Sequence, residues 1–133
     1  LVHSLDSVRL ADALEQAAAA RDLVQDVLIE VNVAGEEQKT GCPAAEVPAL
    51  AEHAASLAHL RLRGLMTMAP YTDDVATQRK TFAGLREMSA RLTSDLCRLD
   101  VLSMGMTNDF EAAVEEGATM VRLGTALFGE RNL

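Results

Sequence analysis

The amino-acid sequence predicts an α/β fold in which parallel strands alternate with helices. Segments rich in β-branched and aliphatic residues alternate along the 133-residue chain with amphipathic segments of helical spacing. Repeated β–α units of this kind give parallel strands joined by right-handed crossovers. Two architectures fit the pattern, an open doubly wound sheet and part of a (β/α)8 barrel. No Gly-x-Gly-x-x-Gly turn follows the first strand, which disfavours a dinucleotide-binding open sheet.

The amino-terminal part of the chain contains three expected strands, over residues 2–5, 26–33 and 62–68. A helix is expected over 7–21, because apolar residues recur there at helical spacing and Asp6 or Ser7 can cap its start. A second helix is expected between the second and third strands. Pro43 and Pro48 both lie near its beginning, which leaves its first turn open.

The carboxyl-terminal part contributes two further strands and three helical segments. The expected order is a long helix from Asp73 or Asp74, a strand over 101–106, a short helix over 108–116, a strand over 119–123 and a helical turn over 125–128. A complete barrel needs about 250 residues and eight strands. If the fold is a barrel, the five strands of this chain are a little over half of one.

The two faces of the strands favour the barrel. Alternate residues of the second strand place Val27, Ile29, Val31 and Val33 on one apolar face. The opposite face becomes polar toward the carboxyl end, with Glu30 and Asn32, and the last strand adds Arg122. Covered strands of an open sheet are apolar on both faces, whereas a barrel mouth that binds a ligand needs inward polar groups. The alternative, that these polar residues bond to loops at the strand ends, remains open at this stage.

Composition and charge exclude several classes of protein. Acidic residues outnumber basic ones by 20 to 12, so the formal charge is −8, which is unfavourable for binding nucleic acid or an anionic membrane. No apolar run reaches the roughly 18 residues of a membrane span, and the first residues lack the basic region of a signal peptide. Cys42 and Cys97 form no CxxC motif, so we expect reduced thiols, no metal site and a cytoplasmic protein.

Two loops near the carboxyl end are typical of a phosphate site. Barrels often bind phosphate with the loops that follow their last two strands. After the expected fourth strand, Met106 is followed by Thr107, whose hydroxyl can cap a helix or donate to a phosphate. After the last strand, Arg122 is followed by Gly124, which lets a ligand approach the backbone, and by Thr125 at the start of a helical turn. Together the two loops predict a phosphate-bearing ligand.

Several segments resemble the pyridoxal phosphate homeostasis family of the YggS/PROSC type, which is related to the N-terminal barrel of alanine racemase. The two closing motifs carry most of the resemblance, LSMGMTNDFEAA at 102–113 and VRLGTALFG at 121–129. Further segments follow in the family order, HSLDS at 3–7, NVAGEEQKTG at 32–41 and RGLMTM at 63–68. The resemblance covers essentially the whole chain.

This resemblance implies a (β/α)8 TIM-barrel domain that binds pyridoxal 5′-phosphate (PLP), in which residues 1–133 supply the last five β/α units. It implies that Thr107, Gly124 and Thr125 hold the phosphate, that Arg122 faces the pyridine nitrogen and that Met106 borders the cofactor. Because arginine stays protonated, it donates to an unprotonated ring nitrogen, which makes the cofactor a poor electron sink. The implied function is to hold PLP and deliver it to PLP-dependent apoenzymes, without a catalytic reaction of its own.

Two departures from the family pattern matter. The family usually has Ser where this chain has Thr107, a change that keeps the hydroxyl. The lysine that binds the family's cofactor belongs to the first barrel strand, a region that this sequence lacks, and neither Lys39 nor Lys80 matches its position. An alanine racemase-like isomerase and a fragment without binding function therefore remain alternatives. Open barrel edges also predict self-association of the chain.

Overall fold

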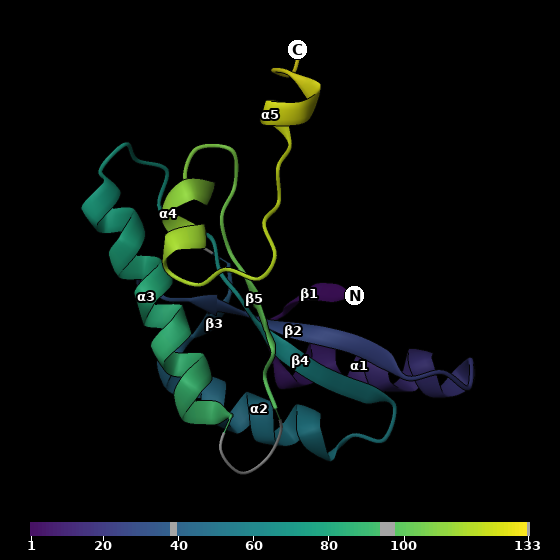
Figure 1. Cartoon of the computed structure of the whole chain (residues 1–133). Coiled ribbons are helices and arrows are strands. Elements are labelled where there is room, and N and C mark those ends of the chain that lie inside the picture. The colour runs from purple at the N-terminus through teal and green to yellow at the C-terminus, as the bar shows by residue number, and fades with distance from the viewer. Residues whose placement is uncertain (38–39, 94–97, 133) are drawn as a thin grey trace.

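A parallel sheet organises the molecule (Figure 1). The computed structural model describes residues 1–37, 40–93 and 98–132. The sheet order is β1-β2-β4-β5, and the two-residue β3 pairs with the end of β2; all these pairings are parallel. The strands are β1 (Val2–Leu5), β2 (Gln25–Asn32), β3 (Cys42–Pro43), β4 (Leu60–Met66) and β5 (Val101–Ser103).

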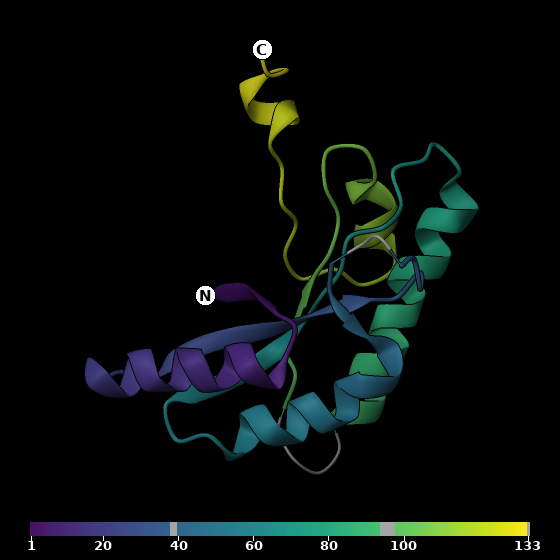
Figure 2. The same ribbon diagram turned by 180° about the vertical axis from the view of Figure 1, so that it is seen from behind.

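Three helices connect successive strands, as the alternating pattern predicts, and two shorter ones follow β5. They are α1 (Val8–Ala20), α2 (Val47–Ser56), α3 (Val75–Leu92), α4 (Phe110–Glu115) and α5 (Thr125–Phe128), with a 3-10 turn over Ala44–Glu46 before α2. The Ser7 hydroxyl accepts a hydrogen bond from the backbone N–H of Leu10, and the Asp74 carboxylate accepts one from Ala76, so both predicted caps are present. Figure 2 shows α1 and α2 covering one side of the sheet, and Figures 1 and 2 show α5 standing away from the other elements.

The hydrophobic core lies between the sheet and these helices. Val27, Ile29 and Val31 of β2 are buried in it, so the face predicted to be apolar is the face that the helices cover. The helices contribute buried residues at helical spacing, among them Ala11, Leu50, Ala54, Phe82 and Leu85. Burial of this face against the helices leaves the opposite face of the sheet for the polar groups.

The opposite face of the sheet is concave. His3 on β1 and Ser103 on β5 are three strand spacings apart in the sheet order, which would be about 14 Å in a flat sheet. Their side chains nevertheless meet, with His3 Nδ1 3.0 Å from Ser103 Oγ. The sheet must therefore curl strongly around its polar face. Such curvature is typical of part of a barrel and differs from an open doubly wound sheet.

Several expected boundaries were wrong, chiefly at the carboxyl ends of the strands. The strand expected over 101–106 ends at Ser103, because Gly105 adopts a φ of +103°, which turns the chain out of the extended conformation. The strand expected over 119–123 is reduced to an isolated bridge between Met120 and Ser103. The backbone N–H of Arg122 still donates to the Gly105 carbonyl, so this segment stays against β5.

Two other regions differ from expectation. Strand β3 and the 3-10 turn occupy the segment around Pro43 in which the first turn of the second helix was left open, and α2 begins at Val47. Of the two cysteines, Cys42 is free and buried, as expected for a reduced thiol, and Cys97 lies outside the described residues. None of the helices in the described ranges has the length and apolarity needed to cross a lipid bilayer.

Candidate functional site

A cleft opens at the carboxyl ends of β4 and β5. Its volume is about 720 Å³. It is lined by all five residues that the sequence predicts for the site, together with six others: Met68, Ala69, Tyr71, Met106, Thr107, Asn108, Asp109, Arg122, Gly124, Thr125 and Glu130. The two loops expected to form a phosphate site are therefore neighbours in space, although about fifteen residues separate them in sequence.

Arg122 lies in the cleft with one of its hydrogen-bond donors unsatisfied within the described part of the chain. Its Nη2 donates to the Thr67 carbonyl at 3.0 Å, whereas its Nε is buried and has no hydrogen-bond partner among the described residues. Burial lowers the pKa of Arg122, while nearby Glu30 and Asp109 act in the opposite direction. An arginine keeps its charge even so. Because buried polar groups are nearly always paired, the free N–H marks a position for an acceptor from a ligand.

Thr107 joins the two loops that line the cleft. Its hydroxyl oxygen accepts a hydrogen bond of 3.2 Å from the backbone N–H of Ala126, which lies in α5. The hydroxyl proton remains available to an acceptor. Gly124 lies just before α5, and a Cβ added there would have no heavy atom within 4 Å. The backbone beside Gly124 is therefore open to a bulky group such as a phosphate.

Asp109 holds the loop after β5 in shape, a role that the sequence analysis missed. This buried carboxylate accepts a hydrogen bond of 2.8 Å from the backbone N–H of Met106, and the Met106 carbonyl in turn accepts from the backbone N–H groups of Asp109 and Phe110. A Cβ at Gly105 would lie 2.7 Å from the Cβ of Ala113, so only glycine fits this tight turn. An Asp in the first turn of the helix expected over 108–116 was the available signal.

Of the three polar residues expected to point inward, Glu30 and Arg122 do so, and Asn32 bonds to its own loop instead. Glu30 is buried on the concave face, where it accepts a 2.6 Å hydrogen bond from the Thr40 hydroxyl. Arg122 lines the cleft, as expected. Asn32 was wrongly assigned to the mouth, because its side chain accepts from the Gly35 N–H and donates to the Glu36 carbonyl. Asn32 closes its own loop, which is the alternative that the sequence left open.

Lys80, the lysine in the described part of the chain, does not line the cleft. Lys80 lines a separate hollow between α3 and the loop after β2, together with Thr77 and Gly84, and Lys39 lies outside the described residues. Within the described ranges, no group of three or more His, Cys, Asp or Glu side chains is arranged to hold a metal ion. The donors that line the described cleft, Arg122 Nε–H and the Thr107 hydroxyl, can pair with an anion or with another hydrogen-bond acceptor.

Comparison with known proteins identifies relatives over nearly the whole chain. The family model described as alanine racemase, N-terminal domain, matches residues 1–132. The chain is 48% identical over 132 residues to the pyridoxal phosphate homeostasis protein of Aquifex aeolicus and 47% identical over 131 residues to that of Pseudomonas aeruginosa. These matches cover 98% of this chain but only 58% and 56% of the two relatives. The chain thus spans a little over half of their length.

Solved structures give the same result. PipY of Synechococcus elongatus, determined with PLP bound, matches with a TM-score of 0.87 and 35% identity, over 96% of this chain and 59% of PipY. An alanine racemase of Clostridium difficile matches with a TM-score of 0.74 at 18% identity, over 96% of this chain and 33% of the racemase, a likeness of fold alone. The predicted alanine-racemase-like α/β fold is confirmed. The chain belongs to the alanine racemase N-terminal domain family.

Proposed function

We propose that this chain forms the phosphate- and ring-binding half of a PLP-holding barrel that serves cofactor homeostasis in the cytoplasm. The unpartnered Nε–H of Arg122 in the cleft carries this proposal, because a pyridine nitrogen is a neutral acceptor of the kind that this donor lacks. The PLP bound to PipY and the names of the curated relatives support the choice of ligand.

The residues of the cleft fit the shape and charge of PLP. Arg122 donates from Nε to the ring nitrogen and stays in place through its bond to the Thr67 carbonyl. The Thr107 hydroxyl and the backbone at Gly124 and Thr125 receive the phosphate, and Met106 borders the ring. When bound, PLP supplies an aldehyde and an electron-withdrawing ring, but a ring nitrogen held by arginine stays unprotonated and withdraws electrons weakly.

We propose that the protein holds and delivers PLP and does not turn over a substrate. A racemase would need a lysine base in the cleft and an opposing tyrosine, and no described lysine lines the cleft. The alternative of a racemase-like isomerase is tested by incubating the PLP-loaded protein with L-alanine and measuring D-alanine by chiral chromatography. Steady production of D-alanine would contradict the carrier function.

Calorimetric titration with three related compounds tests the binding site. We expect PLP and pyridoxine 5′-phosphate to bind with similar affinity, because the proposed contacts are to phosphate and ring nitrogen and not to the aldehyde. Pyridoxal, which lacks the phosphate, is expected to bind at least about tenfold more weakly, the loss of a charge-assisted hydrogen bond or more. Equal affinity for pyridoxal and PLP would show that Thr107, Gly124 and Thr125 are not the phosphate site.

Two proposals concern the partners of the chain, and the open sheet edge supports the first of them. Strand β1 is an edge strand of the described sheet, and Met120, Leu127 and Phe128 are exposed beyond β5. We propose that these surfaces associate with further β/α units or with a second copy of the chain, and that the recipients of PLP are PLP-dependent apoenzymes. Sedimentation velocity of the 133-residue chain tests the first point, and a compact monomer at all concentrations would contradict self-association.

A further inference from the structure

Tyr71 is a strongly exposed aromatic residue at the rim of the cleft. Its exposed fraction is 89%, and it lines the same cleft as Arg122 and Thr107. It is the only tyrosine of a chain that contains no tryptophan. The proposed phosphate and ring-nitrogen contacts leave this ring without a role.

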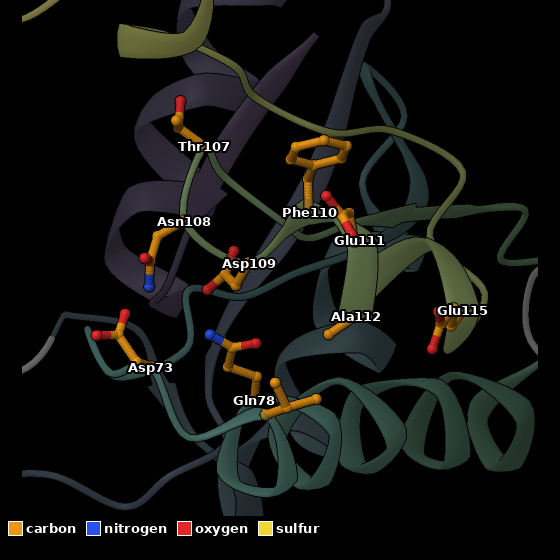
Figure 3. A pocket seen from close by; sticks show the side chains of 10 residues that line it. Asp73, Gln78, Thr107, Asn108, Asp109, Phe110, Glu111, Ala112 and Glu115 are labelled. Atoms are coloured by element: carbon orange, nitrogen blue, oxygen red, sulfur yellow. The ribbon is translucent and has the colours of Figure 1, made fainter.

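The backbone beside Tyr71 is anchored, although its ring is exposed. The Thr72 carbonyl accepts two side-chain hydrogen bonds, one of 2.8 Å from Gln78 Nε2 of α3 and one of 2.9 Å from Asn108 Nδ2 of the loop after β5. Gln78 is itself buried. Figure 3 shows the amide nitrogens of Asn108 and Gln78 turned toward the segment that leads to Asp73. The rim is therefore held to the same loop that carries Thr107, while the phenol ring is exposed to solvent.

The chain around Tyr71 forms one wall of the cleft. It runs on from Thr67, whose carbonyl holds Arg122, and places Met68, Ala69 and Tyr71 along the lining. Thr107, Gly124 and Thr125 line the same cleft. A flat ligand that has its ring nitrogen at Arg122 and its phosphate at these residues shares the cleft with Tyr71, so the tyrosine ring can lie against a face or edge of the ligand. Aromatic side chains form favourable stacked or edge-to-face pairs with such rings.

We infer that Tyr71 contacts the pyridine ring of a bound vitamin B6 5′-phosphate and covers it from solvent. The inference rests on the proposed function, since it names a further residue of the same binding site. Tyr71 acts through its aromatic ring, so phenylalanine can replace it. Its contribution is to retention of the ligand and not to the stability of the fold, because its side chain is almost fully exposed in the free protein.

The test combines calorimetry with tyrosine fluorescence on the same 133-residue chain. Calorimetric titration with PLP gives the affinity, and the 133-residue chain has one fluorescent reporter, Tyr71, whose lifetime is expected to shorten as PLP saturates the site. The lifetime, unlike the intensity, is insensitive to absorption of light by free PLP. We expect Tyr71→Ala to weaken PLP binding by about three- to tenfold, the size of one aromatic pair, and Tyr71→Phe to restore the parental affinity.

Phe128→Ala is the matched control. Phe128 is also an aromatic residue, 85% exposed, but it does not line the cleft, so its removal is expected to leave PLP affinity unchanged. Saturable PLP binding with an unchanged Tyr71 lifetime, or a Tyr71→Ala variant that binds as tightly as the parent, would overturn this inference and leave the proposed function standing. Failure of the parental chain to bind PLP would overturn both.

Discussion

The two ends of the sheet differ in how fully the hydrogen bonds of two charged residues, Asp26 and Arg122, are satisfied. At the amino ends of β2 and β4, Asp26 accepts hydrogen bonds from Arg61 Nε at 2.6 Å, Arg61 Nη2 at 3.0 Å and Arg63 Nη1 at 3.1 Å. At the carboxyl ends, Arg122 has one carbonyl partner and a buried Nε–H without a partner in the described part of the chain. The charges at the amino ends are paired within the fold, whereas Arg122 Nε–H at the carboxyl ends has no described partner, and the carboxyl ends are where β/α barrels place their ligand sites.

Two glycine substitutions distinguish most clearly a residue needed for the stability of the fold from a residue proposed to bind PLP. A Cβ at Gly64 of β4 would overlap the carbonyl group of Val101 on β5, so Gly64→Ala must push the two strands apart. We expect it to lower the free energy of unfolding by at least about 3 kcal/mol, measured by urea denaturation, because backbone cannot yield as a side chain can.

Gly124→Ala is the matched substitution at the other end. Its φ of −107° suits alanine and a Cβ meets no heavy atom within 4 Å, so stability should stay within about 0.5 kcal/mol of the parent. PLP affinity should fall, because the methyl group occupies the space proposed for the phosphate. A Gly64→Ala variant with parental stability would show that Gly64 is not needed for the fold. A Gly124→Ala variant with parental PLP affinity would show that the phosphate does not lie at Gly124.

The second largest effect is expected for Arg122→Ala. Loss of the charged donor should weaken PLP binding by about 1.5–3 kcal/mol, the cost of one charge-assisted hydrogen bond in a desolvated site. The unfolding free energy should change little. In the parent, Arg122 stabilises the fold through its bond to the Thr67 carbonyl, but its buried Nε–H without a described partner is destabilising. Calorimetry and urea denaturation measure the two quantities on the same variant. A large loss of stability with unchanged PLP affinity would make Arg122 a scaffold residue.

The sequence predicted the cleft better than it predicted the strands around it. Met106, Thr107, Arg122, Gly124 and Thr125 all line one cleft, because the carboxyl ends of parallel strands meet at the same edge of a sheet. Whether these residues bind PLP stays a prediction. Strand ends were predicted poorly, because they depend on local backbone conformation.

The errors have identifiable physical causes. The positive φ of Gly105 ends β5 three residues early, and a period-two pattern carries no sign of such a turn. Asn32 fits the inward face by alternation, yet its amide bonds to the backbone of its own loop. The partners of Thr72 come from α3 and from the loop after β5, contacts that no single-sequence pattern contains.

A smaller effect is expected at the paired end of the sheet. Asp26→Asn removes the charge shared with Arg61 and Arg63 and should lower stability at neutral pH by about 0.5–1 kcal/mol, as for partly exposed ion pairs. Hydrogen bonding to Arg61 is the main reason why the pKa of Asp26 lies below its ordinary value. Its contribution is therefore present above the unfolded-state value of about 4 and is lost as the pH falls through the folded-state value.

The variant should accordingly show a flatter loss of stability in acid, while its PLP affinity at neutral pH matches the parent. Urea denaturation at a series of pH values from neutral to about 2.5 measures the difference in unfolding free energy between the parent and the variant. This difference should shrink toward zero at the acid end. A difference that is constant over the whole range would mean that Asp26 acts through packing and not through its charge.

The smallest expected effect concerns His3, the residue that spans the concave face. Burial, then the charge of Arg122 and then the amino terminus lower the pKa of His3 in the folded state. The unfolded chain therefore binds a proton more readily, and stability falls as the pH drops through about 6.5, the ordinary value for histidine, toward the lower folded-state value. His3→Asn removes this dependence, so the parent-minus-variant difference in unfolding free energy should decrease as the pH falls from about 7.5 to 5.

Ser103→Ala separates the titration of His3 from the hydrogen bond between His3 and Ser103. It should lower the unfolding free energy by about 1 kcal/mol but keep the histidine, and hence the loss of stability in acid. A difference curve for His3→Asn that stays level across this range would show that His3 is not coupled to the positive charge of the cleft.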